Sequence, residues 1–245
     1  MGSEKFGPPV TSNNHVLPLW KNDSELFSIA RRELFTALVG DVMDKLGHLN
    51  QFLSPGIKPA CDDMVVVGRA MPVMEEDIDL NKAGGSDGQI VKPFGMMLEA
   101  LDELRENEVY ICAGASPSYA LWGGLMSIRA MKLGAAGVVL NGYWRDTREV
   151  LKLKFPTFGM GSYAQDQEPR GRVVSYRVPI DVWGVKVSPG DIIFGDLDGV
   201  VVVPRELEKE VFSGAIEKAR GEKMVRKALQ EGMTSVEAFR KFGLM

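Results

Sequence analysis

Cysteine and histidine are scarce in this chain of 245 residues, which contains two of each. Cys61 and Cys112 lie far apart and outside any CxxC motif, so neither a zinc site nor a disulfide scaffold is expected. His15 lies in a polar N-terminal segment and His48 just after a predicted helix end, which disfavours a histidine-based triad or metal centre. The chain also lacks GxSxG, GxxxxGK[ST] and a GxGxxG that opens a βαβ unit.

Long apolar runs and runs of like charge are absent as well. No apolar stretch reaches the roughly 18 residues that a membrane-spanning helix needs, and no signal peptide is apparent. The formal net charge of −4, without a run of five like charges, disfavours binding to nucleic acid or to a membrane surface. Hydrophobic residues make up 45% of the chain, enough for a sizeable core. We therefore expect a soluble cytoplasmic protein.

The hydrophobic pattern predicts one α/β domain over residues 23–245, preceded by an N-terminal extension over residues 1–22 that is rich in Pro, Asn and Ser. Helices are expected from Asp23-Ser24 to about Gly47, after Pro204, and after a capping box that begins at Thr234. A polar glycine loop, 81–88, contains Ser86 and Asp87 and either closes over a ligand or simply turns. Further helices are predicted at 95–103 and 125–133, and strands at 64–67, 69–74 with Gly68 as a bulge, 109–113, 138–140, 157–161, 173–178, 182–185, 191–195 and 199–204.

The turn before the helix at 125–133 is the first candidate binding element. Gly123 and Gly124 lead into the helix, whose first N–H groups have no partner within the helix. Together with the helix dipole these groups can bind an anion, and glycine lets a ligand approach the backbone. Taken alone, however, two glycines favour a plain strand-to-helix turn.

Charged residues follow the buried strand at 138–140. Arg145 can bind a carboxylate through two parallel hydrogen bonds, and Asp146 offers the hard oxygen ligands that Mg²⁺ or Mn²⁺ prefers. A structural Arg–Asp pair is the alternative. If residues 147–151 form a helical turn, Glu149 shares a face with Asp146, and two such carboxylates repel unless a cation or a proton lies between them. Arg148 could instead pair with Glu149 at the surface.

Gly124, followed after twenty residues by Arg145-Asp146-Thr147-Arg148-Glu149, resembles the RraA-like family. This family includes the 4-hydroxy-4-methyl-2-oxoglutarate/4-carboxy-4-hydroxy-2-oxoadipate aldolases, which are class II pyruvate aldolases, and the regulator of ribonuclease E activity A. The likeness spans about residues 24–243, and its other segments are 40–47, 137–139, 155–158, 189–191, 198–200 and 204–206.

The resemblance implies a three-layer β/β/α sandwich with flanking N- and C-terminal helices, assembled as a homotrimer or a dimer of trimers with active sites between subunits. It implies Mg²⁺ (or Mn²⁺) at Asp146 and an Arg145 that binds substrate and stabilises an enolate. Glu222 of a neighbouring subunit is matched to a further metal-site glutamate. The backbone that would hold the carboxylate of a 2-oxo acid is that of Gly123, Gly124, Leu125 and Met126.

The chain departs from the well-studied aldolases at Gly124, where they have an aspartate near a metal-bound water. Glu149 either supplies that oxygen, directly or through water, or signals a different reaction. We predict a divalent-metal-dependent carbon–carbon lyase, an aldolase and/or oxaloacetate-type decarboxylase, that acts on a 2-oxo acid through a pyruvate enolate. The alternatives are a metal-dependent lyase, hydratase or hydrolase of another hydroxy or oxo acid, and a non-catalytic regulator of RNA turnover. The presence of both Arg145 and Asp146 favours catalysis.

Overall fold

The computed structural model describes residues 19–79 and 94–243. The predicted glycine loop at 81–88, with Ser86 and Asp87, lies outside these residues, as does most of the predicted extension at 1–22. No helix in the described part of the chain is both long and apolar enough to cross a membrane.

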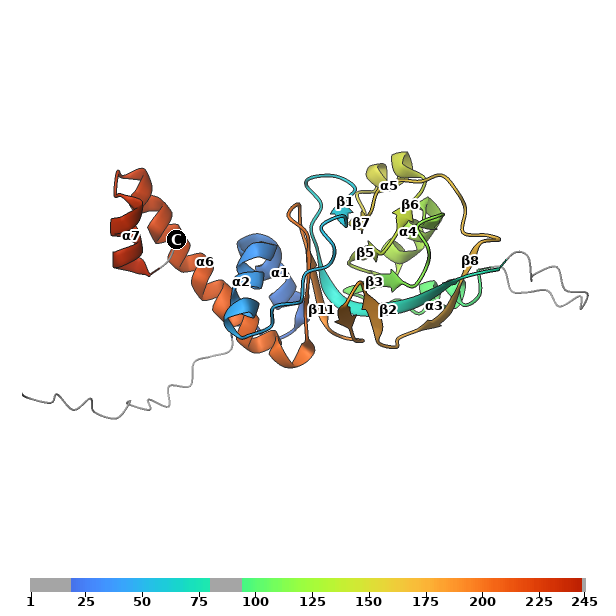
Figure 1. Cartoon of the computed structure of the whole chain (residues 1–245), viewed down its shortest axis with the longest axis horizontal. Coiled ribbons are helices and arrows are strands. Elements are labelled where there is room, and N and C mark those ends of the chain that lie inside the picture. The colour runs from blue at the N-terminus through green and yellow to red at the C-terminus, as the bar shows by residue number, and fades with distance from the viewer. Residues whose placement is uncertain (1–18, 80–93, 244–245) are drawn as a thin grey trace, which may run out of the picture.

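A mixed eight-stranded sheet forms the centre of the molecule (Figure 1). Its order is β1-β7-β5-β3-β2-β11-β12, and β8 also pairs with β2. The pairs β2–β3, β3–β5 and β5–β7 are parallel. The central strands read as continuous apolar runs because they are buried on both faces. The strands are β1 (Lys58–Pro59), β2 (Val66–Asp77), β3 (Glu108–Ala113), β5 (Gly137–Leu140), β7 (Thr157–Gly159), β8 (Gly171–Tyr176), β11 (Ile192–Gly195) and β12 (Val200–Val203).

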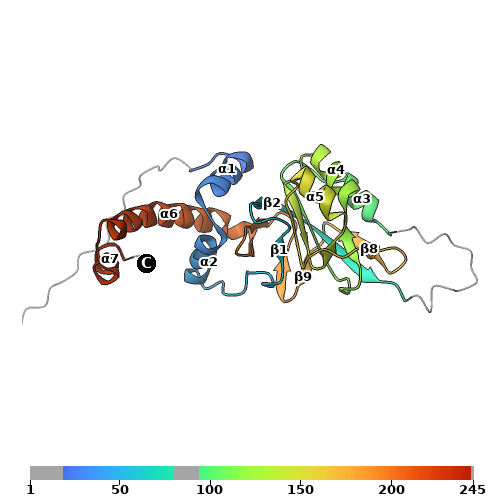
Figure 2. The ribbon, with the colours of Figure 1, turned by 90° about the horizontal axis from the view of Figure 1, so that it is seen from above.

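Three layers are present, as expected for a β/β/α sandwich. Helices α3 (Met97–Asp102), α4 (Gly124–Lys132) and α5 (Thr147–Leu153) lie together at one side of the sheet (Figure 2). Their core contains the stacked rings of Trp122 and Phe155. The hairpin of β9 (Ile180–Val182) and β10 (Val185–Val187) packs on the opposite face of the sheet.

A separate group of helices flanks the sheet edge formed by β11 and β12 (Figure 1). Alternate residues of β11 face different cores: Phe194 packs with the helices, whereas Ile193 packs with the β9–β10 hairpin. Helices α6 and α7 extend away from the sheet (Figure 2). The helices are α1 (Asp23–Glu33), α2 (Thr36–Lys45), α6 (Glu208–Gln230), which follows the 3-10 turn η1 (Arg205–Leu207), and α7 (Ser235–Phe242).

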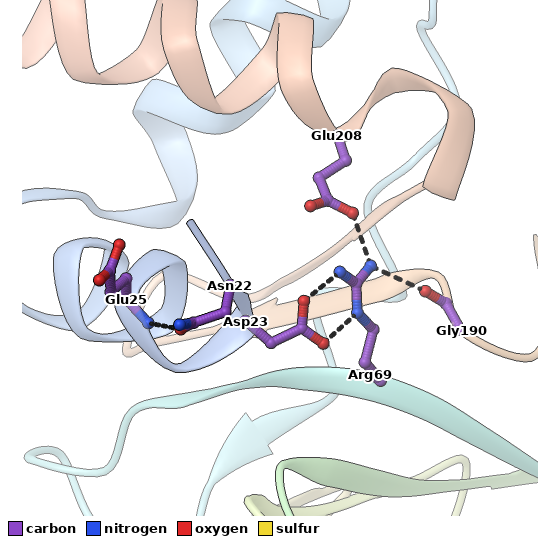
Figure 3. Close-up of polar contacts among 6 residues, drawn as sticks. All are labelled: Asn22, Asp23, Glu25, Arg69, Gly190 and Glu208. Atoms are coloured by element: carbon purple, nitrogen blue, oxygen red, sulfur yellow. Dashed lines mark hydrogen bonds and ion pairs between the residues drawn. The ribbon is translucent and has the colours of Figure 1, made fainter. Parts of the chain in front are cut away.

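A network around Arg69 joins this helical group to the sheet (Figure 3). The guanidinium donates to both carboxylate oxygens of Asp23 at 2.8 and 2.5 Å, to Glu208 at 2.6 Å and to the Gly190 carbonyl at 3.2 Å. The hydrogen bonds from Arg69 hold the pKa of Asp23 below its usual value. One side chain on β2 therefore connects α1, α6 and the turn before β11.

The single helix predicted from Asp23 to about Gly47 is wrong, because two helices occupy this segment. Leu34 and Phe35 are extended between them. The backbone N–H and the hydroxyl of Thr36 both donate to the carboxylate of Asp196, at 2.7 Å each. The carboxylate of Asp196, which is distant in sequence, thus caps α2. The helix propensities of residues 23–47 do not reveal this contact.

Two strand predictions also need correction. Residues 64–67 and 69–74 do not form two strands about a bulge at Gly68; β2 is one strand, and its irregularity falls between Met74 and Glu75. Glycine is required at position 68 for a different reason, because an added Cβ would lie 2.3 Å from the carbonyl oxygen of Asn107. Residues 182–185 form the hairpin turn between β9 and β10 rather than a strand. The capping box at Thr234 is confirmed.

Candidate active site

Two short parallel strands deliver the predicted site residues to one place. Strand β4 (Ala120–Trp122) pairs with β6 (Tyr143–Trp144), and helices α4 and α5 begin just after them. The N–H of Arg145 donates to the carbonyl of Trp122 at 2.9 Å. Because parallel strands end at the same edge, the starts of both helices lie side by side, which is a common position for ligand sites.

Asp146 occupies the junction between β6 and α5 in a left-handed conformation, with φ 56° and ψ 37°. Aspartate tolerates this conformation better than most residues. Its Oδ2 accepts a hydrogen bond from the N–H of Gly124 at 3.1 Å. The side chain is exposed and has no ion pair among the described residues, Arg145 included. An ion pair between Arg145 and Asp146 is therefore wrong, but the structural alternative holds in one respect, because Asp146 caps the first N–H group of α4.

The two glycines make room for two carboxylates at the start of α4. A Cβ on Gly123 would lie 2.8 Å from Asp146 Oδ2, and a Cβ on Gly124 would lie 2.2 Å from Glu149 Oε2. Glu149 therefore fills the volume that a side chain at position 124 would take. It forms no ion pair with Arg148, so that alternative is also wrong.

The start of α4 keeps unsatisfied donors near these carboxylates. The N–H of Gly124 is bonded to Asp146, whereas those of Leu125 and Met126 have no acceptor within the described part of the chain. Such groups and the helix dipole favour an anion. An anion at this position would lie beside the carboxylates, which suits a site where a cation balances the charge.

Arg145 has a partner that the sequence did not suggest. Its Nη1 lies 3.1 Å from Asp166 Oδ2, and the two side chains are 38% and 40% exposed. Apart from this ion pair, the guanidinium of Arg145 has no polar partner among the described residues, so most of its donors remain available. Asp166 lies in the polar segment 161–170, which has no hydrophobic periodicity and no motif that would identify Asp166 as a residue of the site.

Arg145 and Asp146 lie between two hollows. The first has a volume of about 270 Å³ and also contacts Asp166 and Gln167. We call it the apolar hollow, since most of its wall is apolar: Phe94, Met97, Leu98, Leu101, Leu125 and Met126 contribute to it. The second hollow has a volume of about 290 Å³ and is lined by Thr147, Ser162, Tyr163 and Ala164 beside the Arg–Asp pair.

A buried carboxyl group lies behind the apolar hollow. Gln167 donates to Glu75 Oε2 at 2.6 Å, and both residues are 2% exposed. Burial raises the pKa of Glu75 to about 8, so its carboxyl group is mostly protonated at neutral pH. Its Oε1 has no hydrogen-bond partner among the described residues. Sequence analysis did not identify Glu75 and Gln167 as residues of the site. The one signal was that two acidic residues, Glu75 and Glu76, follow the predicted strand at 69–74.

Glu222 is not brought to the site within one chain. It lies on α6, which runs away from the side of the sheet that carries α4 and α5 (Figure 1), and its nearest charged partner is Lys218 at 3.9 Å. Nor does the described part of the chain contain a cluster of three or more His, Cys, Asp or Glu side chains placed to hold a metal ion. Within the described part of one chain, the carboxylates beside the start of α4 are those of Asp146 and Glu149.

The fold and site define a mixed α/β protein with a hollow at the ends of two parallel strands. The sequence profile described as "RraA-like: Aldolase/RraA" matches residues 36–202. The chain belongs to the RraA-like family. Sequence resemblance had predicted this family, and the match confirms it.

Named relatives differ in what they are said to do. A Halalkalibacterium halodurans protein named "Putative 4-hydroxy-4-methyl-2-oxoglutarate aldolase" is 29% identical over 209 residues, which cover 85% of this chain and 90% of that protein. A solved structure described as one of several "novel cellulases" from gut-associated microbes is 32% identical, with a TM-score of 0.72 over 83% of this chain and 88% of that one. Streptomyces coelicolor RraAS2, described as an unusual member of the RNase ES inhibitor RraA family, shares the fold at 24% identity and a TM-score of 0.72, covering 84% of this chain and 99% of that one. The relatives named as aldolases support an aldolase-type lyase at the level of the family.

Proposed function

We propose that this protein is a divalent-metal-dependent carbon–carbon lyase that forms a pyruvate enolate from a 2-oxo acid. The observation that carries the proposal is what lies together at one strand edge: two carboxylates without an ion pair, a guanidinium with one carboxylate partner, and two helix N–H groups without an acceptor, all judged among the described residues. The two carboxylates carry like charges close to each other, and a cation bound between them would relieve their repulsion.

The residues present fit Mg²⁺ or Mn²⁺. Asp146 and Glu149 provide oxygen donors, and Mg²⁺ commonly keeps several waters while using one or two protein carboxylates. When bound there, the ion would supply Lewis-acid polarisation of the 2-oxo group. We further propose a homotrimer or a dimer of trimers, in which Glu222 of a neighbouring copy would complete the surroundings of the ion.

The chain's own groups account for the remaining steps. The N–H groups of Leu125 and Met126 hold the substrate carboxylate, and Arg145 donates to the oxygen on which enolate charge develops. Because this charge is larger in the transition state than in the bound substrate, the contribution of Arg145 appears mainly in kcat. Glu149, exposed beside the start of α4, can carry the proton that the enolate carbon finally receives.

Oxaloacetate decarboxylation tests the proposal directly. We expect turnover with Mg²⁺ or Mn²⁺, loss of turnover with a chelator, and at least a ~100-fold fall in kcat/KM for Asp146→Asn. Asparagine tolerates the left-handed conformation, so folding should be retained. Asp44→Asn, an exposed aspartate on α2, is the matched control. Turnover that survives both the chelator and Asp146→Asn would contradict the proposal.

A second candidate function rests on the contact between Gly124 and Glu149. If Glu149 does not replace the aspartate of the aldolases, the site suits a lyase, hydratase or hydrolase of another hydroxy or oxo acid. Gly124→Asp alone would collide with Glu149, so the informative variant is Gly124→Asp combined with Glu149→Ala. A gain of aldol cleavage in the double variant over the wild type would favour this second function.

A further inference from the structure

The apolar hollow has two chemically different ends. Its polar end contains Arg145, Asp146, Asp166 and Gln167, where the proposed reaction would occur. Its other end is formed by side chains from α3 and from the start of α4, without a charged group among the described lining residues. A molecule that reaches from the first end into the second therefore passes from a polar to an apolar environment.

The apolar end is part of the same cavity and not merely an exposed surface. Met97 and Leu101 are 7% and 6% exposed, so they form a floor, whereas Leu98 and Leu125 are largely exposed at the rim. The cavity volume of about 270 Å³ is larger than a pyruvyl group requires. Space remains for a substituent beyond the reacting carbons.

Charge decides which substituent fits. Among the described residues that line the hollow, Arg145 is the single cation, and Asp166 already neutralises part of its charge. A second carboxylate on the substituent would lose hydration in the apolar end without a cationic partner there. An apolar substituent would gain from leaving water, with affinity rising roughly fourfold for each fully buried methylene group.

We propose that the preferred substrates are 4-hydroxy-2-oxo acids with an apolar substituent at C4, rather than dicarboxylates. This specificity rests on the proposed lyase function. In the reaction the C3–C4 bond breaks and its electron pair becomes the enolate of pyruvate. The C4 hydroxyl loses its proton and C4 becomes the carbonyl carbon of an apolar aldehyde. The enolate then takes one proton at C3, so no oxidant or further reactant is needed.

A substrate series measures this preference. We expect kcat/KM for 4-hydroxy-2-oxo acids to rise about two- to fourfold per methylene as the C4 substituent grows from methyl to propyl. We expect 4-hydroxy-4-methyl-2-oxoglutarate to be at least about tenfold poorer than the propyl compound. If kcat/KM does not change across the series, the proposal is overturned. That result would follow if a second copy of the chain covered α3 and α4. Equal or better cleavage of the dicarboxylate would overturn it too.

A charge introduced at the rim sharpens the test. Leu98 is 56% exposed, so Leu98→Arg should fold, and it should narrow or reverse the preference by favouring the dicarboxylate. Val236→Arg on α7, at 59% exposure, is the matched control and should leave the preference unchanged. An unchanged preference in Leu98→Arg would mean that substrates do not reach this wall.

Inhibition of oxaloacetate decarboxylation separates failure of the specificity from failure of the reaction. We expect 2-oxooctanoate to inhibit at lower concentration than 2-oxoglutarate. Decarboxylation with the opposite order of inhibition would overturn the specificity and leave the proposed function intact. Absence of metal-dependent decarboxylation, together with absence of cleavage across the whole series, would overturn both.

Discussion

Arg69 and Arg145 are two arginines in acidic surroundings, and they are satisfied to very different degrees. The Arg69 side chain is 19% exposed and donates to two carboxylates and one carbonyl at distances of 2.5 to 3.2 Å (Figure 3). The Arg145 side chain is 38% exposed and has one carboxylate partner, at 3.1 Å. The first guanidinium holds structural elements together, whereas the second keeps donors free for a ligand.

The carboxylates around the two arginines differ in the same way. Asp23 and Glu208 are both occupied by Arg69, whereas Asp146 accepts one backbone hydrogen bond and Glu149 has no ion pair with a described residue. The paired groups around Arg69, a closed network, stabilise the fold through their geometry. The groups around Arg145, an open network, can still bind a ligand. The same substitution in the two networks should therefore affect different properties.

Arg145→Lys should have the largest effect, on activity. An ammonium is a compact point charge and cannot reproduce the planar fork of a guanidinium. We expect kcat for oxaloacetate decarboxylation to fall about 100-fold, with a smaller change in KM, because the lost hydrogen bond matters most in the transition state. Steady-state kinetics and urea denaturation of the same sample measure both properties. A variant with normal kcat would remove Arg145 from the reaction.

Arg69→Lys should have a smaller effect, on stability. One ammonium cannot satisfy both oxygens of Asp23, Glu208 and the Gly190 carbonyl, so we expect a loss of about 2 kcal/mol in the free energy of unfolding. The kinetic constants should stay within about twofold of the wild type. Arg32→Lys, in an exposed pair with Glu33, is the control and should change stability little. A large fall in kcat for Arg69→Lys would contradict the inference that the groups around Arg69 affect stability and those around Arg145 affect activity.

The difference between the two networks also explains what could be predicted from sequence. Helix α4 and the Arg145-Asp146-Glu149 group lie within one stretch of chain, so local periodicity and spacing predicted them. Asp166 and Gln167 reach the hollow from a segment without regular structure, and Glu75 reaches it from a strand far earlier in the chain. The break between α1 and α2 likewise depends on a distant aspartate. Contacts of this kind arise from tertiary packing and have no local signature.

Glu75→Gln should change how stability depends on pH. The pKa of Glu75 in the folded protein, about 8, is above its ordinary value of 4.5. Between these values the folded state binds a proton that the unfolded state has lost, so wild-type stability falls as pH rises. This one group contributes a slope of about 1 kcal/mol per pH unit, which the glutamine removes while it can still accept from Gln167.

Urea denaturation at pH 5, 6, 7 and 8 measures this slope. The variant should gain stability relative to the wild type with each step, most between pH 6 and 7 and least between pH 7 and 8, where Glu75 of the folded protein begins to ionise. Glu106→Gln, at an exposed position, is the control. Parallel curves for the wild type and Glu75→Gln would show that Glu75 is ionised in the folded protein.

Asp166→Asn should have the smallest effect, and its direction tells whether Asp166 competes with the substrate. The pair with Arg145 is about two-fifths exposed, so its contribution is in the range of about 0.2–1 kcal/mol. If Asp166 only neutralises Arg145, its removal should lower KM for an anionic substrate about two- to fivefold and leave kcat within twofold. Asp102→Asn, in the exposed pair with Arg129, should change neither constant. A rise in KM would show instead that Asp166 orients the guanidinium, and the open network would then include one structural contact.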